Sequence, residues 1–317
     1  MLTPLQKQTA QAIVNLFETS SARGDYGAVT VIPGDTGHLS FGRSQTTLGS
    51  GNLHALLQRY CDNAGARFGP RLAPWLERLA PWLERLEQRD TTLDHELRLH
   101  NLLRATADDP VMREMQDQFF DEGYWQPAAR IAAGMGIATP LGLAVVYDSL
   151  IQGSWKTVRD LTIAQAGRLA DLGEHAWIDA YIATRHAWLA GNRRSDLRAT
   201  TYRMEAFQRL AEQGYWGLEL PLVVRGAELS PATLYATPPG CYDGPQPGTR
   251  SIALQTPLAR GLDVRLLQLA LSEQGIVIKA DGIFGRTSAN LLRDYQASAG
   301  LPPTGVADPA LLGRLLG

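Results

Sequence analysis

Between Ala227 and Arg260 the sequence has no hydrophobic periodicity, and this interruption constrains the fold more than any other feature. The segment contains SPATLYATPPGCYDGPQPGTR, whose proline and glycine content is typical of a linker or an extended connector. The sequence therefore predicts a domain over residues 1–226, a linker over 227–260 and a small module over 261–317. A chain of 317 residues is long enough for this division.

The pattern of the large domain is mostly helical. Apolar residues recur at helical spacing after Thr3 and Pro4, which should cap and begin a first helix. Glycines then punctuate short β-branched pieces over residues 26–51, which predicts a hairpin or a three-stranded sheet. Amphipathic helices return over residues 53–210. We therefore expect a mainly α, α+β fold, in which a helical domain with one small sheet is followed by a three-helix module.

The composition excludes several classes of protein. The 30 Lys and Arg residues nearly balance the 32 Asp and Glu residues, so we expect no nucleic-acid partner. Cys61 and Cys241 are too few for a disulfide scaffold or a cysteine zinc site, and we expect no metal and no cofactor. No run of about 18 apolar residues occurs, so no membrane span is expected. The first residues also lack the pattern of a Sec signal peptide.

Residues 71–84 contain RLAPWLE twice in tandem. Each copy carries a proline, which breaks helical hydrogen bonding in a helix interior and argues against a two-heptad coiled coil. We therefore predict a local duplication that forms a short helical insert begun by proline. Alternatively, Trp75 and Trp82 would form a surface on which sugar rings stack.

Two carboxylates are placed for acid and base chemistry. Glu18 directly follows the apolar helical face of Ile13, Leu16 and Phe17, so its carboxyl group is expected at a helix end, where it can hold and donate a proton. Asp35 lies in the turn PGDTG and is expected to stay ionised. A carboxyl pair of this kind performs glycoside hydrolysis. On the residues alone, a surface charge for Glu18 and an ordinary turn residue for Asp35 are the simpler interpretations.

The segment Ala12–Tyr60, with FETSS, GDTGHLSFG and TLGSGNLHALLQRY, resembles the N-terminal part of the family 46 chitosanases of the lysozyme-like superfamily. The resemblance implies a lysozyme-like helical domain with a small sheet. It also implies that Glu18 is the general acid, that Asp35 is the general base, and that Ser40 helps to hold the attacking water.

The resemblance continues through YWQPAARIAAGMG, VVYDSLIQGS and WIDAYIATRHAWL, and it ends near YRMEAFQRLAEQGYWGLELPLVVRG. In the family, an aspartate and two arginines form an ion-pair network behind the active site. The matching positions are Asp148, Arg185 and Arg203, and the resemblance implies that they support the catalytic carboxylates.

Two departures from the family pattern bear on the substrate. Gly37 stands where chitosanases carry an arginine, and Asn52 stands where they carry an acidic residue. A polycationic substrate should be met by carboxylates, so the loss of one favours an N-acetylated glycan over chitosan. We predict that Asn52 and His38 contact the substrate, although a structural role in its turn is the simpler interpretation of His38.

The C-terminal segment GLDVRLLQLALSEQGIVIKADGIFGRTSANLLRDYQASAGLPPTGVAD resembles the three-helix peptidoglycan-binding module of cell-wall hydrolases. Its glycine turns allow tight connections between helices. The resemblance implies that Asp281, Phe284 and Tyr295 are site residues of the wall-binding module. A packing module that has lost glycan binding is the alternative.

These features predict a cell-wall glycoside hydrolase that cleaves β-1,4 bonds of peptidoglycan by an inverting Glu–Asp mechanism, with the module holding it to the glycan strands. The alternatives are a chitosanase and a non-catalytic peptidoglycan-binding protein. We expect action in the periplasm or outside the cell, after specialised secretion or holin-type release, unless a leader has been removed from the sequence. An exported toxin would have an immunity or inhibitor protein as a further partner, whereas a phage lysin would not.

Overall fold

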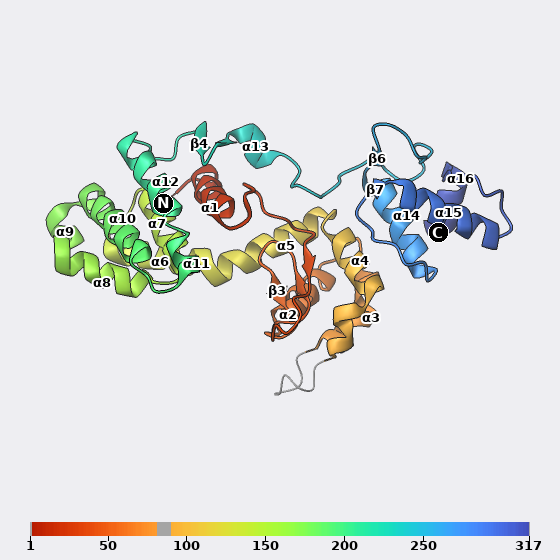
Figure 1. The fold of residues 1–317 in the computed structure, drawn as a ribbon, viewed down its shortest axis with the longest axis horizontal. Helices are drawn as coiled ribbons and strands as arrows, with labels where there is room; N and C mark the ends of the chain where they lie inside the picture. The colour runs from red at the N-terminus through yellow and green to blue at the C-terminus, as the bar shows by residue number, and fades with distance from the viewer. Residues whose placement is uncertain (1, 81–89, 317) are drawn as a thin grey trace. The chain divides into compact units, whose positions relative to one another are not determined.

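The computed structural model describes residues 2–80 and 90–316 (Figure 1). The fold is mainly helical with small sheets, as the sequence predicts. The chain forms two compact units, each built from two stretches: Met1–Gly24 with Phe120–Ala236, and Asp25–Phe119 with Thr237–Gly317. The domain boundaries at residues 226 and 260 stay predictions, because these units group the chain by packing and do not test them.

The first unit is built around two helices, α1 (Pro4–Thr19) and α7 (Pro140–Ile151), which pack against each other. Residues 141–149 of α7 are all buried, so this helix lies in the centre of the core. The remaining elements are η3 (Asp121–Trp125), α6 (Gln126–Met135), α8 (Trp155–Ala166), α9 (Leu169–Leu172), α10 (Glu174–Ala190), α11 (Ser195–Arg198), α12 (Tyr202–Glu212), β4 (Leu222–Val224), β5 (Ala227–Leu229) and α13 (Pro231–Tyr235).

The predicted start of α1 is confirmed. The backbone N–H of Gln6 donates to Thr3 Oγ1 over 3.2 Å, and the Thr3 N–H donates to Gln6 Oε1 over 2.9 Å. This capping box satisfies two donors that the helix itself leaves without partners. At the other end Ser20 is left-handed, with φ 57°, and its N–H donates to the Leu16 carbonyl, so α1 ends one residue after Glu18.

The second unit contains the predicted three-stranded sheet. Strands β1 (Val29–Thr30), β2 (Ser40–Phe41) and β3 (Thr46–Thr47) pair antiparallel in the order β1-β2-β3, with Ser40 opposite both Thr30 and Thr47. The other elements of this unit are α2 (Asn52–Cys61), α3 (Gly69–Leu79), η2 (Thr91–His95), α4 (Leu97–Thr106), α5 (Pro110–Phe120), β6 (Ala259–Arg260), α14 (Leu262–Glu273), β7 (Ile283–Phe284), α15 (Arg286–Ser298) and α16 (Pro309–Leu316).

The first RLAPWLE copy lies inside α3, and most of the second lies outside the described residues. Pro74 is in the interior of α3, and Pro70, not a proline of the repeat, stands in the first turn. The expectation of a helix begun by the repeat proline is therefore wrong for this copy, because the helix starts earlier. Trp75 is half-buried against the core of the second unit, while Trp82 lies outside the described residues.

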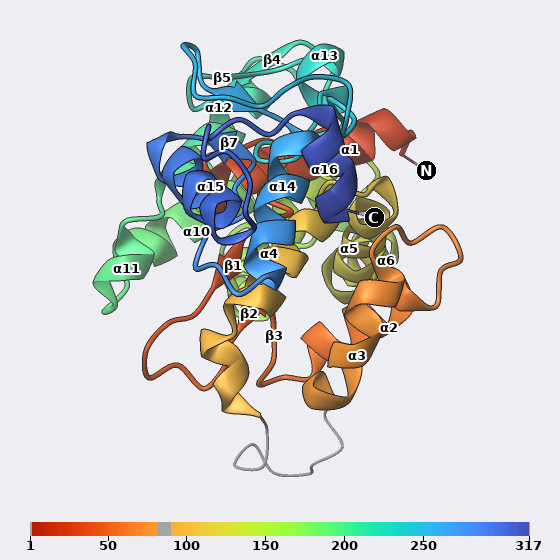
Figure 2. The same cartoon turned by 90° about the vertical axis from the view of Figure 1, so that its right-hand side faces the viewer.

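The C-terminal module packs directly on the part of the unit that carries the sheet. Helix α14 lies beside α4 in Figures 1 and 2. Leu269 and Ala280 of the module are buried in one hydrophobic cluster with Leu102 and Leu103 of α4. The apolar surface that this packing removes from water stabilises it by about 25 cal/mol for each Å² buried. Module and sheet region thus share a core.

Asn101 of α4 joins the two parts by hydrogen bonds. Its wholly buried amide donates to the Ile278 carbonyl over 2.7 Å and to Ser272 Oγ over 2.9 Å, and its Oδ1 accepts the Ala280 N–H over 2.9 Å. A buried amide with three partners in the module fixes both the direction and the spacing of the contact. The contact between α4 and the module therefore combines apolar packing with hydrogen bonds of defined geometry.

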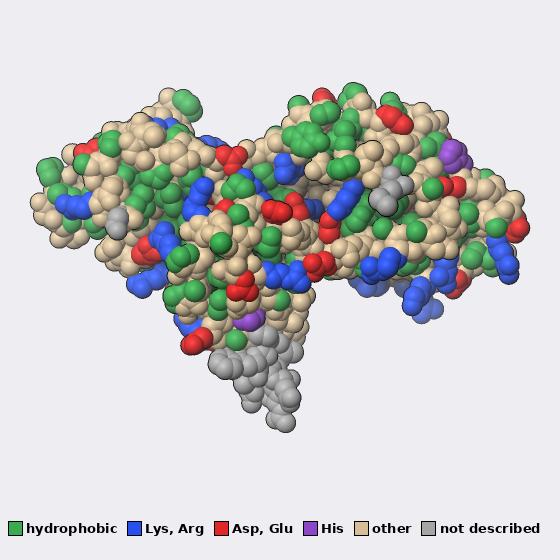
Figure 3. All heavy atoms as spheres, turned by 180° about the vertical axis from the view of Figure 1, so that it is seen from behind, with side chains coloured by type: hydrophobic (Ala, Val, Ile, Leu, Met, Phe, Trp, Pro, Cys, Tyr) green, Lys and Arg blue, Asp and Glu red, His purple; other side chains and the backbone are tan. Residues whose placement is uncertain are grey.

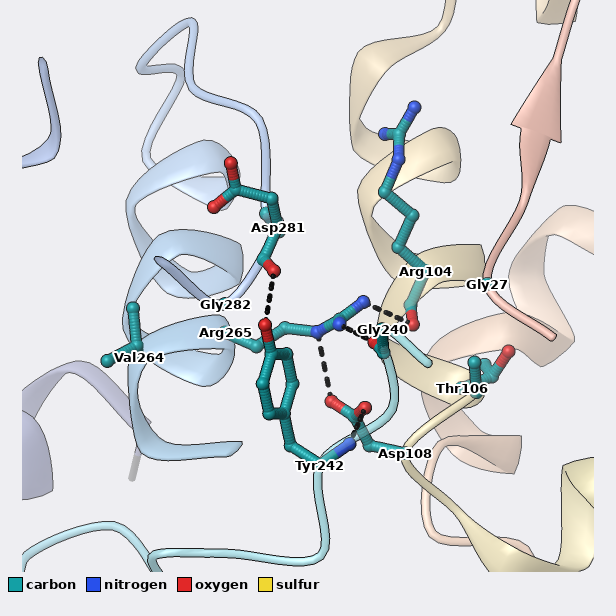
Figure 4. Close-up of polar contacts among 12 residues, drawn as sticks. Gly27, Arg104, Thr106, Asp108, Gly240, Tyr242, Val264, Arg265, Asp281 and Gly282 are labelled. Atoms are coloured by element: carbon teal, nitrogen blue, oxygen red, sulfur yellow. Dashed lines mark hydrogen bonds and ion pairs between the residues drawn. The ribbon is translucent and has the colours of Figure 1, made fainter. Parts of the chain in front are cut away.

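Arg265 of α14 makes a second polar joint, which Figure 4 shows. Its side chain crosses from the module to donate to the carbonyl of Arg104, over 2.8 Å, and to the carbonyl of Gly240. Its guanidinium also lies over the ring of Tyr242, 4.9 Å from the ring centroid. The Tyr242 N–H in turn donates to Asp108 Oδ1 over 2.8 Å.

Residues 237–258, which belong to the predicted linker, contain no helix or strand but are held against the second unit. Cys241 is buried beside Tyr26 and Ala107. Ile252 is wholly buried and forms a bridge with Ala307, with N–H···O distances of 2.8 and 2.9 Å. This stretch is an extended connector with its own buried contacts.

Candidate active site

Glu18 stands at the end of α1, as the sequence predicts. Its side chain is 41% exposed, and its Oε1 accepts a hydrogen bond from Nη1 of Arg203 on α12 over 2.8 Å. The helix is held below it by the apolar face that includes Phe17, whose ring packs edge-on against Phe207 at 5.3 Å between centroids. The carboxyl group is thus fixed on one side and open to solvent on the other.

Behind Glu18 the structure brings together the three other charged residues that the resemblance selected. Asp148 is wholly buried in α7; its Oδ1 accepts from Arg203 Nη1 over 2.9 Å, and its Oδ2 accepts from Nη1 of Arg185 on α10 over 2.6 Å. Burial alone would lower the pKa of Arg203, but the carboxylates of Asp148 and Glu18 outweigh it and raise that pKa. Arg203 therefore stays charged and is shared between two carboxylates.

Gln152 completes this network, and the sequence analysis missed it. Its Oε1 accepts from Arg185 Nη2 over 2.7 Å, and its amide donates to Thr200 Oγ1 over 2.7 Å. A signal was present, because Gln152 follows Asp148 by four residues and therefore lies on the same face of the helical stretch.

Asp35 lies at the tip of a turn in the second unit, and its side chain is exposed. The Asp35 N–H donates to the Ile32 carbonyl over 3.1 Å, and Gly34 before it has φ +80°, which favours glycine. The following residues approach Gly49 so closely that a Cβ there would lie 2.2 Å from the Thr36 carbonyl oxygen. The turn is thus packed against the segment after β3, with the Asp35 carboxylate facing outward.

Ser40 and His38 follow Asp35 on the same segment. Ser40 is buried in β2, and its hydroxyl lies 3.3 Å from the His38 carbonyl, to which it donates. His38 is half-buried and has a partner within the protein, since its Nδ1 lies 2.8 Å from Oδ2 of Asp94. Asp94 carries no local sequence signal and was missed. The proposed roles of Ser40 with water and of His38 with substrate stay predictions.

The two positions that depart from the family pattern are both accessible. Asn52 is exposed at the first position of α2, and its N–H donates to Ser50 Oγ over 3.2 Å. At Gly37 a Cβ would lie 2.8 Å from Asp35 Oδ2, so a side chain at this position would have to displace the Asp35 carboxylate. Contact of Asn52 with substrate stays a prediction.

The three module residues Asp281, Phe284 and Tyr295 all make contacts within the module, and their part in wall binding stays a prediction. Phe284 is wholly buried in the module core. Asp281 Oδ1 accepts from the Ile283 N–H over 2.9 Å and from the Gln268 amide over 3.0 Å, which shapes the turn. Tyr295 is half-buried and packs on the same core as Phe284.

Figure 3 shows basic and acidic side chains intermixed over the face it displays. Within residues 2–80 and 90–316 no group of three or more His, Cys, Asp or Glu side chains is placed to hold a metal ion. No helix in the described part of the chain is long and apolar enough to cross a bilayer.

The helix-end glutamate and the buried ion-pair network behind it lie in a mainly helical fold with a small sheet, and the family comparisons show that the chain is a glycoside hydrolase. The family model for glycosyl hydrolase family 46 matches residues 12–222, and the model for a putative peptidoglycan binding domain matches residues 260–315. The chain belongs to glycosyl hydrolase family 46 and carries a peptidoglycan-binding domain.

Known relatives agree with this assignment. The chain is 25% identical over 236 residues to a chitosanase of Bacillus subtilis (strain 168), covering 70% of this chain and 83% of that one. The family 46 chitosanase of Gynuella sunshinyii in complex with chitotetraose is 26% identical with a TM-score of 0.51, covering 72% of this chain and 98% of that one. The native chitosanase of Bacillus subtilis MY002, 23% identical with a TM-score of 0.51 over 71% and 96% of the chains, shares the fold.

Proposed function

We propose that the chain hydrolyses β-1,4 glycosidic bonds of peptidoglycan, with Glu18 as general acid and Asp35 as general base. The observation that carries the acid role is the sharing of Arg203 between Glu18 and Asp148. In this role Glu18 donates a proton to the leaving glycosidic oxygen, and Asp148 offsets part of the Arg203 charge beside it. Once Glu18 has given that proton to the leaving oxygen, Arg203 stabilises the new carboxylate.

Asp35 supplies the complementary function. Its exposed carboxylate stands on a turn with its backbone fixed, which suits a base that takes a proton from water. Inversion needs the water between the base and the sugar, with the two carboxyl groups about 6.5–9.5 Å apart. Ser40, five residues after Asp35, is proposed to hold that water.

The packing of the module supports peptidoglycan as the substrate. The peptidoglycan-binding module shares a hydrophobic core with the sheet region that carries Asp35, so a strand bound by the module is held to the same compact unit as the proposed base. This is closer coupling than a flexible tether provides. We infer that the enzyme acts at the bacterial cell wall, in the periplasm or outside the cell.

Chitosan is the second candidate, and the relatives favour it. The matched proteins are named chitosanases, and one was solved with chitotetraose. Asn52 argues in the other direction, since an amide offers a cationic polymer no countercharge. The two polymers share the β-1,4 linkage, so the chemistry proposed for Glu18 and Asp35 is the same for both.

Mass spectrometry of products from purified sacculi and from chitosan tests this proposal. We expect soluble fragments with a new sugar reducing end from sacculi, formed faster than fragments from chitosan, and no fragments from sacculi with Glu18→Gln. Fragments from chitosan but none from sacculi would show that the substrate is chitosan and not peptidoglycan. Binding to sacculi without any product would instead indicate a non-catalytic wall-binding protein.

A further inference from the structure

The turn that carries Asp35 contains a residue in a strained conformation. His38 has φ +57°, in the left-handed region that most side chains avoid. Such a residue costs on the order of 1 kcal/mol and persists only where surrounding contacts hold it. The contacts that hold His38 therefore determine the path of the chain between Asp35 and Ser40.

Asp94 makes those contacts. Its Oδ2 lies 2.8 Å from His38 Nδ1, and its Oδ1 accepts the Leu39 N–H over 2.7 Å. One carboxylate thus holds a side chain and the next backbone amide, and hydrogen bonds to a charged acceptor are the strong ones. Asp94 is only 12% exposed, so solvent competes little for its oxygens.

Asp94 is itself firmly placed. It belongs to η2, where the preceding Leu93 is wholly buried in the core of the second unit. The Leu93 carbonyl accepts a hydrogen bond from His100 Nε2 of α4 over 2.9 Å. The Asp94 carboxylate therefore projects from a short helix that is held both by the burial of Leu93 and by the hydrogen bond from His100.

Without Asp94 the turn has weaker support. The His38 N–H donates to the Asp35 carbonyl over 3.3 Å, and the Gly49 N–H donates to the Gly37 carbonyl over 2.8 Å. These bonds shape the turn but do not hold the His38 side chain or the Leu39 amide. The contacts of Asp94 thus add a polar link between the turn and the helical part of the unit, beside the burial of Leu39 in its core.

We propose that Asp94 and His38 form a clamp that positions the Asp35 carboxylate and the Ser40 hydroxyl for hydrolysis. The proposal rests on the proposed function of Asp35. Misplacing a reacting group by about 1 Å can cost on the order of 100-fold in rate. His38 and Asp94 act through Asp35 and Ser40 and are therefore positioning residues, so their loss should lower kcat by a larger factor than it changes KM.

The test compares kcat, KM and Tm of single variants on the polymer that the wild type hydrolyses faster. His38→Gly removes the side-chain contact and also relieves the left-handed strain, so we expect an unchanged or higher Tm with a 10- to 100-fold lower kcat. Asp94→Ala should lower kcat as much. Asp94→Asn, which can still accept the Leu39 N–H, should lose less activity. His95→Ala, at an exposed neighbouring position, is the matched control and should keep the wild-type kcat.

The double variant His38→Gly/Asp94→Ala should lose no more activity than either single variant, because both act through one contact. The proposal is overturned if His38→Gly keeps kcat within twofold of the wild type, or if kcat falls only in proportion to Tm. Asp35→Asn, measured in parallel, separates the two hypotheses. Loss of activity in Asp35→Asn with full activity in His38→Gly overturns the clamp alone, whereas full activity in Asp35→Asn overturns the proposed function and the clamp with it.

Discussion

Arg265 Nε lies 3.0 Å from Asp108 Oδ2, and this ion pair joins the module to the segment after α4 with both side chains almost fully buried. Burial raises the pKa of Asp108 to about 6, while Arg265 and the Tyr242 N–H favour the charged carboxylate. Arg265 also has its two carbonyl acceptors (Figure 4). The polar contacts of its guanidinium therefore all lie inside the joint, so exposing the group to water would require the joint to open.

Arg265→Ala should destabilise the second unit strongly. The variant leaves Asp108 buried without its cation, and breaking one side of a buried pair typically costs about 3–5 kcal/mol. Chemical denaturation measures the loss. The control is Arg71→Ala, which removes an ion pair to Glu273 at the same joint; that pair is exposed, so about 0–1 kcal/mol is expected. Equal effects of the two substitutions would show that burial of the Arg265 pair contributes nothing.

Asp148→Ala should be among the most destabilising substitutions in the first unit. It leaves the buried charges of Arg185 and Arg203 without their shared partner, and a loss of about 3–5 kcal/mol is expected. Asp160→Ala, an exposed carboxylate on α8 paired with its neighbour Arg159, should change stability by less than about 1 kcal/mol. If denaturation midpoints of the two variants agree, the buried network does not stabilise the fold.

Both cysteines should be slow to react. Burial raises the pKa of Cys61 and of Cys241 to about 11, so only about one thiol in a thousand is ionised at pH 8. With a dithiobis-nitrobenzoate reagent at pH 8 we expect rates at least 100-fold below that of an unstructured cysteine peptide. Two thiols per chain should react rapidly in guanidinium chloride. Rapid labelling of Cys241 in the native protein would mean that the connector does not stay packed.

His100 should make stability depend on pH. Desolvation lowers the pKa of His100 below its usual value, so between the lowered value and about 6.5 the unfolded chain binds more protons than the folded one. The stabilising contribution of neutral His100 is therefore complete above about pH 6.5 and is lost as the pH falls through the lowered pKa. Between pH 7.5 and pH 5 the Tm of the wild type should fall by more than the Tm of His100→Gln. Parallel Tm curves for the two proteins would contradict this.

Local features of the fold were predictable from the sequence. The capping box of Thr3 and Gln6 depends on residues three apart, and the sheet around Asp35 depends on nearby turns and β-branched residues. The network around Asp148 was found because its members match a family pattern. In each case the signal lies within one element or one motif.

Apart from Gln152, the features that were missed depend on pairs far apart in the chain. Asp94 contacts a residue 56 positions earlier, and Asn101 donates to a carbonyl 177 positions later. No periodicity or spacing marks such pairs, because they exist only once elements pack. The burial of Phe284 likewise depends on the packing of the module core and not on its turn.

The most direct test of the central claim is the rate of reducing-end release by Glu18→Gln and by Asp35→Asn, with both variants shown to keep the wild-type Tm. Removing a general acid or base typically costs about 100- to 10,000-fold, so we predict at least a 100-fold loss for each substitution. Glu122→Gln, a carboxylate of η3 outside the proposed site, should retain the wild-type rate. If either Glu18→Gln or Asp35→Asn hydrolyses the polymer at the wild-type rate, the assignment of that carboxyl group to catalysis is contradicted.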